Sequence, residues 1–402
     1  DAINSFTFAQ IYHALNPDVF IDNHVSNGAD YPYTLTYIAS LCERLAPSMR
    51  NLTYADCIPT LETYCKQGGF DLFPYVELKG DTPESGIVAF NDLPRYAMGY
   101  ASLFHSLSFT VETHMLKPFP DRVQATLSFM NAMIAYTITK SNEIEAARKA
   151  AIDWTNTRHY FPYNFQLDTN HTEPIRFKGY TAIYPKHPIT GLEQLGYDRT
   201  QPYEKHIAHY KFYKAQDSVI VPKYYVVGAQ ELAIIARLKA NKVAYTVVNE
   251  STVRSVEVSS YVVKNFKAPA KPYEGHFKLQ QIELERQPYL LELKPGDLLI
   301  PCAQDKASFL HSVLQPLTED SYLSWNFFDS YLQQKEYFSP YVFKDQIESI
   351  LNAQPALKAS YEERKRLDVK FASDEWEQLY FIYQNSPYFE PSFMRLPVYE
   401  IH

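Results

Sequence analysis

The chain lacks the sequence signatures of several large enzyme classes. It has only 12 glycines in 402 residues, and no GxGxxG, GxxxxGK[ST] or GxSxG pattern occurs. Rossmann-type dinucleotide binding, P-loop phosphate chemistry and α/β-hydrolase chemistry are therefore not indicated. The four cysteines form no CxxC pair and no zinc-finger spacing, which removes the usual thiolate metal sites.

An excess of positive charge and long apolar runs are also missing. The formal net charge is −8 at pH 7. The chain therefore lacks the excess positive charge that displaces counterions from nucleic acid, and we expect no nucleic-acid partner. No apolar run approaches the roughly 18 residues that a membrane-spanning helix needs, so we expect no membrane span. No signal-peptide pattern opens the sequence, although Asp1 in place of Met indicates that the natural start is not displayed.

Three cysteines lie close together and leave two interpretations open. Cys42, Cys57 and Cys65 fall within 24 residues. An exported protein would close a local disulfide such as Cys57–Cys65. In a reducing compartment the three would be small buried hydrophobes. We slightly prefer a periplasmic or secreted location to a cytoplasmic one, and oligomeric state stays open.

The composition is that of a folded chain of two or three domains, with 46% hydrophobic and 21% charged residues. Residues 1–152 alternate helix and strand, which predicts an α/β domain with a mostly parallel sheet. Its expected elements are a helix at 5–15, a strand at 19–21, helical structure at 31–50, a loop-rich stretch at 51–100, a strand at 108–112 and a helix at 121–150.

Residues 153–402 change character and predict a strand-rich α+β domain that ends in a helical tail. Polar and apolar residues alternate over 160–184, which is typical of strands with one wet face. Further strands are expected at 219–227, 243–248, 255–263, 276–284 and 297–301, with helices at 230–240 and 374–385.

Two of the strands expected in the first domain end on residues that can do chemistry. The apolar run Val19–Ile21 leads to His24, and Ser108–Val111 leads to Glu112. If the two strands are neighbours, both side chains point into one crevice, as a metal ligand with a general base or as a base with its orienting partner. The alternative is a structural histidine and a solvated glutamate.

These two stretches resemble carboxypeptidase A-like zinc metallopeptidases. Asp18–His24 looks like the strand carrying the third zinc ligand, and Ser108–Glu112 is similar to the strand that ends on the catalytic glutamate. Residues 93–117 and 27–31 look like a bacterial branch of the family. The resemblance covers roughly residues 1–150 and implies a partial carboxypeptidase-like fold that acts on a peptide or small amide substrate.

The resemblance implies roles for both residues. His24 would be one zinc ligand in a site of two histidines and a glutamate, and Glu112 would be the general acid/base that serves the metal-bound water. The family's first two ligands come as His-x-x-Glu, and none of the 12 histidines has Glu three positions later. We therefore expect a C-terminal portion of a longer enzyme, inactive alone. The alternative is a non-catalytic protein of the same fold that binds peptide or glycan.

Three further residues are candidates for substrate binding. Arg95 lies in the loop before the Glu112 strand, where it could meet a substrate carboxylate or be a surface arginine. Asp30 and His114 are expected near the crevice. His206 and His209 form an HxxH pattern, which surface histidines explain more simply than metal binding. The aromatic stretch 322–341 indicates an interdomain core, or else a ligand platform.

Overall fold

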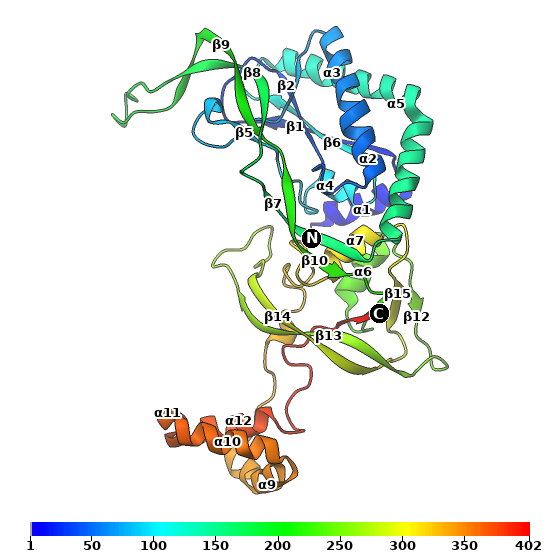
Figure 1. Cartoon of the computed structure of the whole chain (residues 1–402), viewed down its shortest axis with the longest axis vertical. Helices are drawn as coiled ribbons and strands as arrows, with labels where there is room; N and C mark the ends of the chain where they lie inside the picture. The colour runs from blue at the N-terminus through cyan, green and yellow to red at the C-terminus, as the bar shows by residue number, and fades with distance from the viewer. Residues whose placement is uncertain (1) are drawn as a thin grey trace.

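The computed structural model describes residues 2–402 and has a mixed α/β architecture with several open sheets. Figure 1 shows three regions along the longest axis: an N-terminal helix-and-sheet layer, a second sheet in the middle and a separate group of short helices. No helix among residues 2–402 is long and apolar enough to cross a membrane.

The N-terminal sheet has the strand order β1-β6-β2-β3. Strand β1 is parallel to β6, β6 is antiparallel to β2, and β2 is parallel to β3, so this sheet is mixed. Its strands are β1 (Val19–Ser26), β2 (Leu35–Ala39), β3 (Leu72–Pro74) and β6 (Leu107–His114). The expected strands at 19–21 and 108–112 are confirmed, and both are longer than expected.

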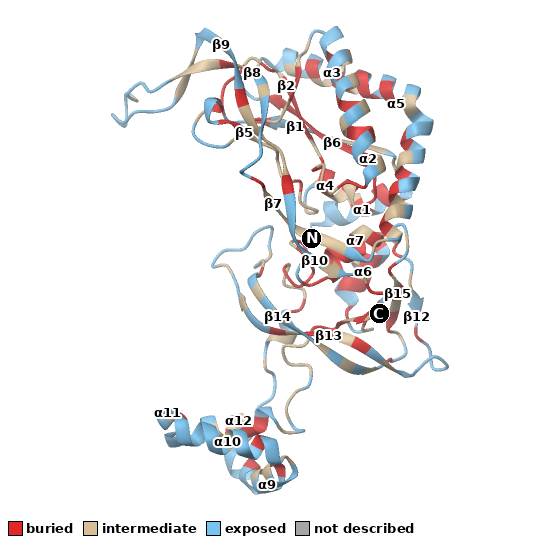
Figure 2. Cartoon of the chain, in the orientation of Figure 1, coloured by how far each residue is buried: buried red, intermediate tan, exposed pale blue. Residues whose placement is uncertain are grey.

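Helices cover one face of this sheet. Figure 2 shows buried residues on the sides of these helices that face the sheet. The helices are α2 (Pro47–Asn51), a π-helical segment (Leu52–Cys57), α3 (Ile58–Gln67) and α5 (Phe119–Asn156). Leu35, Phe109 and Phe129 are fully buried in the core between them. Because side chains alternate along a strand, the other face of the sheet receives the polar residues of β1 and β6.

Two expectations for residues 31–100 are wrong. The stretch 31–50 contains β2 instead of one helix, because its run Leu35–Ile38 of β-branched and aromatic residues fits a buried strand. The stretch 51–100 begins with continuous helix up to Gln67, whose apolar side packs against α5. Cys57 and Cys65 lie on that apolar side. Both are buried and form no disulfide, which fits the interpretation as small buried hydrophobes.

Strands from residues 160–220 pack back onto the first domain. Strands β8 and β9 form a long hairpin whose Phe177 and Ile207 join the core of Tyr31 and Phe73. The expected strands at 160–184 are confirmed as β7 and β8. The elements here are β4 (Glu77–Leu78), a 3-10 turn (Pro83–Ser85), β5 (Ile87–Val88), β7 (Tyr160–Leu167), β8 (Glu173–Ile183), β9 (Gly196–Tyr210) and β10 (Tyr213–Ile220).

The second sheet has the order β12-β15-β11-β16-β13-β14. Its core includes Tyr12 and Phe104 from the N-terminal layer, so the two layers share one apolar core. One strand was expected at 219–227, but the structure has two, β10 ending at Ile220 and β11 beginning at Tyr224. Pro222 lies between them, and proline has no backbone N–H to donate to a neighbouring strand. The elements are β11 (Tyr224–Val227), α6 (Leu232–Ala240), β12 (Thr246–Val247), β13 (Ser255–Lys267), β14 (Gln280–Glu292), β15 (Leu298–Pro301), α7 (Ala307–Leu314) and β16 (Val398–Ile401).

The group of short helices has a small core of its own, in which Ile382 and Tyr383 are buried with Phe343. Figure 1 shows it joined to the second sheet by two connecting segments. Its helices are α9 (Pro340–Ala353), α10 (Pro355–Leu367), α11 (Val369–Ser373) and α12 (Glu375–Gln384). Three other helices are α1 (Ile3–Leu15), α4 (Ala97–Ser102) and α8 (Asp329–Leu332).

Replacing Asp374 by Ala is expected to weaken α12 locally. The Asp374 carboxylate caps this helix by accepting a hydrogen bond from the Glu377 N–H at 3.0 Å. Loss of such a cap costs about 0.5–2 kcal/mol, so hydrogen exchange of the α12 amides should accelerate accordingly. Asp345→Ala, at an exposed position inside α9, is the matched control. Equal exchange in the two variants would contradict the capping role.

Candidate active site

His24 and Glu112 lie side by side at the carboxyl ends of β1 and β6. The parallel register pairs these two residues directly, so their side chains project from the same face of the sheet. The His24 Nδ1 atom is 3.8 Å from the Glu112 Oε1 atom. The sequence prediction required the two strands to be neighbours, and they are. The register thus forms a histidine–carboxylate pair at one sheet edge.

The polar face around this pair follows from alternation along the strands. Ser26 lies two positions after His24 on β1, and Thr110 lies two positions before Glu112 on β6. Thr36 of β2 is opposite Glu112 and donates its hydroxyl to the Glu112 carbonyl oxygen at 3.5 Å. The pair therefore lies in a polar strip that continues across three strands.

Asp22 is a third member of the site, and the sequence analysis missed it. Its Oδ2 atom is 2.8 Å from the Nε2 atom of His24. The two residues are two positions apart on β1 and therefore share a face. An Asp-x-His pattern on an expected strand is the signal that could have identified it. The imidazole thus lies between two carboxylates, one on each side of the ring.

Glu112 has an environment unlike that of a solvated surface glutamate. Its side chain is 10% exposed, whereas that of His24 is 50% exposed. The Oε2 atom is buried and has no hydrogen-bond partner. Burial raises the pKa of Glu112, His24 opposes that shift, and Asp22 adds to it. A carboxylate with a raised pKa and a free oxygen is suited to accept a proton at near-neutral pH.

Arg95 lies in a different polar cluster. Its guanidinium pairs with Asp320 (Nη2 to Oδ1, 2.8 Å), and its backbone N–H donates to the same carboxylate. Trp325 donates its indole N–H to Asp320 at 2.9 Å. Arg95 therefore joins the loop before α4 to the segment after α7, and its charge is already balanced by Asp320.

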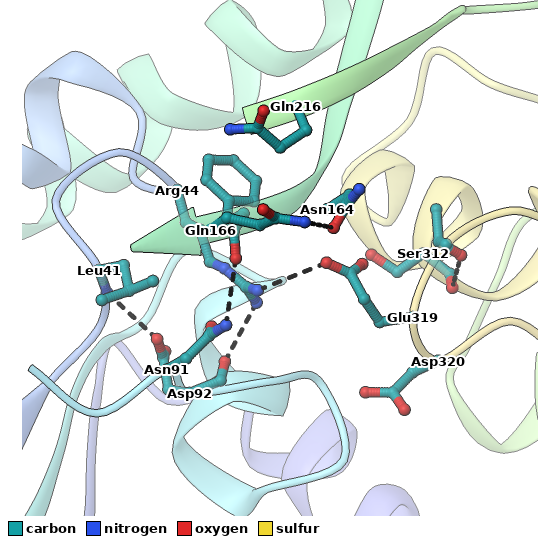
Figure 3. Close-up of polar contacts among 12 residues, drawn as sticks. Leu41, Arg44, Asn91, Asp92, Asn164, Gln166, Gln216, Ser312, Glu319 and Asp320 are labelled. Carbon is teal, nitrogen blue, oxygen red and sulfur yellow. Dashed lines mark hydrogen bonds and ion pairs between the residues drawn. The ribbon is translucent and has the colours of Figure 1, made fainter. Parts of the chain in front are cut away.

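Figure 3 shows a second connection at the same junction. Arg44 donates to the Asp92 carbonyl oxygen at 3.2 Å, and its Nη2 atom is 3.9 Å from Glu319. The Asp92 carboxylate accepts from the Leu41 N–H at 3.1 Å. Polar contacts therefore hold the loop after β2 against the second domain.

Asp30 and His114 are held by neighbouring groups near the ends of β1 and β6. Asp30 is buried and pairs with Arg199 of β9 at 2.6 Å and with Lys117 at 3.7 Å. His114 is buried, with Nε2 2.7 Å from the Ala29 carbonyl oxygen, and its Nδ1 accepts from the Leu116 N–H. Burial lowers the pKa of His114. Both side chains stabilise the loop beside the site, and their substrate-binding roles stay predictions.

The other sequence candidates separate in space. His206 and His209 both lie on β9, and an odd spacing on a strand puts side chains on opposite faces, so the HxxH pattern forms no joint site. Tyr322 and Phe328 of the aromatic stretch are buried in the shared core, as expected of an interdomain core. Trp325 and Phe327 line a cavity of about 760 Å³ between α1, α4 and the second domain.

The described residues do not complete a zinc site. Catalytic zinc is usually held by three protein ligands. Within residues 2–402 no group of three or more His, Cys, Asp or Glu side chains is arranged to hold a metal ion. His24 offers one imidazole nitrogen, and its two carboxylate neighbours do not supply the remaining positions.

Comparisons with known proteins identify no relative: no family model, no curated protein and no solved structure matches this chain.

Proposed function

We propose that this chain carries part of the site of a zinc-dependent, carboxypeptidase-like hydrolase of peptide or related amide bonds. The observation that supports the proposal is the register of β1 and β6, which places His24 beside Glu112 at one sheet edge. His24 is the proposed metal ligand, with the other ligands supplied from outside residues 2–402. Zinc, when bound, supplies an acidic water and polarises the scissile carbonyl.

Glu112 is the proposed general acid/base. Its carboxylate removes a proton from the attacking water, whose oxygen forms the new bond to the carbonyl carbon. The protonated Glu112 then gives that proton to the leaving amine as the C–N bond breaks. The two transfers balance, so the carboxylate is regenerated. Burial and a free Oε2 atom favour this cycle, because they keep the proton affinity of Glu112 high.

The direct test is hydrolysis by the complete gene product. A panel of short peptides with free and amidated C-termini should be incubated with protein in zinc-supplemented buffer, and the products should be identified by mass spectrometry. We expect zinc-dependent cleavage that a chelator abolishes and added zinc restores. Cleavage of free-acid peptides only would indicate carboxypeptidase action. No cleavage of any amide in the panel would contradict the proposal.

As the pH is lowered, the activity should begin to fall at a pH higher than the one at which an ordinary glutamate becomes protonated. A general base must be ionised, and burial raises the pKa of Glu112. The acidic limb of the pH profile of kcat/KM should therefore lie above pH ~4.5, the usual glutamate region. A pH–rate profile from pH 4 to 9 measures this limb. Constant kcat/KM down to pH 4 would contradict the role of Glu112 as base.

Binding without catalysis is the second candidate function. Its supporting observation is the absence, within residues 2–402, of a complete set of metal ligands, together with the aromatic cavity that Trp325 and Phe327 line. Aromatic faces in such cavities bind peptides and sugars. Peptide or glycan binding that is unaffected by zinc, in the absence of any cleavage, would favour this function.

A further inference from the structure

A small cavity lies where the segment after β2, the end of α5 and helix α7 come together, outside the candidate active site. Its volume is about 70 Å³, far below the roughly 300–1,000 Å³ of pockets that hold drug-sized ligands. Arg44, after β2, and Arg158, after α5, line one part of it. Ser308 and Ser312 line it from α7. The cavity therefore has room only for a small group, and its lining offers cations and hydroxyls.

Arg44 has buried hydrogen-bond donors without acceptors. Its Nη1 atom donates to the Asp92 carbonyl oxygen at 3.2 Å. Its Nε and Nη2 atoms are buried and have no hydrogen-bond partner within residues 2–402. The Glu319 Oε1 atom is 3.9 Å from Nη2, too far for a hydrogen bond, and Figure 3 shows Arg44 directed toward it. An acceptor in the cavity would satisfy donors that are costly to leave unpaired.

Arg158 adds a second positive charge to the cavity. The side chain is partly buried, and its guanidinium lies over the Trp154 ring, 4.3 Å from the ring centre. Burial lowers the pKa of Arg158, and no charged group among residues 2–402 offsets that shift. Removing a cation from water without a counter-charge is unfavourable, so an anion in the cavity would stabilise Arg158.

The acidic residues that line the cavity do not cancel both cations. Asp320 is already paired with Arg95 at 2.8 Å and with Lys278 at 3.9 Å. Glu319 is the other carboxylate of the lining, and its side chain is 29% exposed. Two guanidinium groups therefore face one carboxylate that has no closer cation, which leaves an excess of positive charge.

We propose that this cavity binds a small oxyanion, a phosphate or carboxylate group, between Arg44 and Arg158. Guanidinium groups donate paired hydrogen bonds to such groups. Ser308 and Ser312 are four positions apart on α7 and so share one face of the helix, from which their hydroxyls can donate as well. The bound anion connects the first domain to α7 and stabilises their junction. This inference does not depend on the proposed hydrolase activity.

The test is calorimetric titration of the complete gene product with sodium phosphate and, separately, with sodium acetate, at an ionic strength held constant with sodium chloride. We expect one anion to bind per chain, and the anion that binds more tightly identifies the group that the cavity takes. Arg158→Gln should weaken that binding by at least ~10-fold, as expected for loss of hydrogen bonds from a charged group. Absence of binding by both anions would overturn the proposal.

The matched control is Arg122→Gln. Arg122 also lies over an aromatic ring, that of Phe119 at 5.6 Å, but it does not line the cavity. This variant should keep the wild-type affinity, and an equal loss in both variants would contradict the assigned site. Thermal unfolding in chloride shows whether each variant is folded. The bound anion should raise Tm of the wild type and of Arg122→Gln but not of Arg158→Gln; an equal rise in all three would also overturn the proposal.

Discussion

Replacing Glu112 by Gln is expected to reduce kcat by roughly 10²–10⁴-fold, the range that general acid–base groups contribute. Glutamine has nearly the same shape and can occupy the same place on β6, but it cannot accept and return a proton. The variant should fold normally, because the substitution removes a buried carboxylate whose Oε2 atom has no hydrogen-bond partner. Steady-state kinetics with the best substrate of the peptide panel provide the measurement.

The matched control is Glu62→Gln in α3. Glu62 is an exposed helix residue whose pKa partial desolvation raises, and it lies outside the His24 pair, so the substitution tests the loss of a glutamate charge away from the site. This variant should keep kcat and KM within about twofold, well below the catalytic range. If Glu112→Gln retained more than a tenth of the wild-type kcat, Glu112 would not be the proton carrier.

Replacing Asp320 by Ala is expected to destabilise the junction of the two layers by about 3–5 kcal/mol, the cost of removing one partner of a buried ion pair. The Asp320 side chain is 5% exposed and pairs with Arg95 at 2.8 Å. It also accepts the Trp325 indole N–H. The alanine variant leaves both donors without their acceptor in a poorly solvated place. Urea unfolding measures the loss as a lower midpoint.

The control for this prediction is Glu285→Ala. Glu285 pairs with Lys264 on the second sheet, but both side chains are about half exposed, and exposed pairs contribute about 0–1 kcal/mol. We therefore expect Glu285→Ala to lower the free energy of unfolding by less than ~1 kcal/mol. If Asp320→Ala also lowered it by less than ~1 kcal/mol, Arg95 and Trp325 would have found other partners, and the junction would not depend on the Asp320 carboxylate.

The proximity of His24 and Glu112 could be predicted because it depends on local features of the sequence. Each residue follows a short apolar run, and parallel neighbouring strands bring such ends to one edge. The contribution of Asp22 could have been found by the same reasoning, since strand alternation puts it beside His24. The bonding of Arg95 to Asp320 could not, because 225 positions of chain separate the two.

The errors in the predicted fold have similar causes. Leu35, Ile38 and Leu41 have helical spacing, but the β-branched and aromatic residues among them favour the strand that pairs with β6. The last strand, β16, was not predicted, because four residues at the end of the chain become a strand only through pairing with β11 and β13. Such pairings depend on distant segments and leave little local signal.

The zinc content of the purified complete gene product tests the central claim most directly. Elemental analysis after removal of loosely bound metal should find about one zinc per chain, as for a catalytic site. His24→Ala should lose that zinc. His171→Ala should keep it, and this variant is the control because His171 is also an exposed histidine in contact with a carboxylate, that of Asp168. A wild-type protein without zinc, or zinc content unaffected by His24→Ala, would contradict the assignment of His24 as a metal ligand beside Glu112.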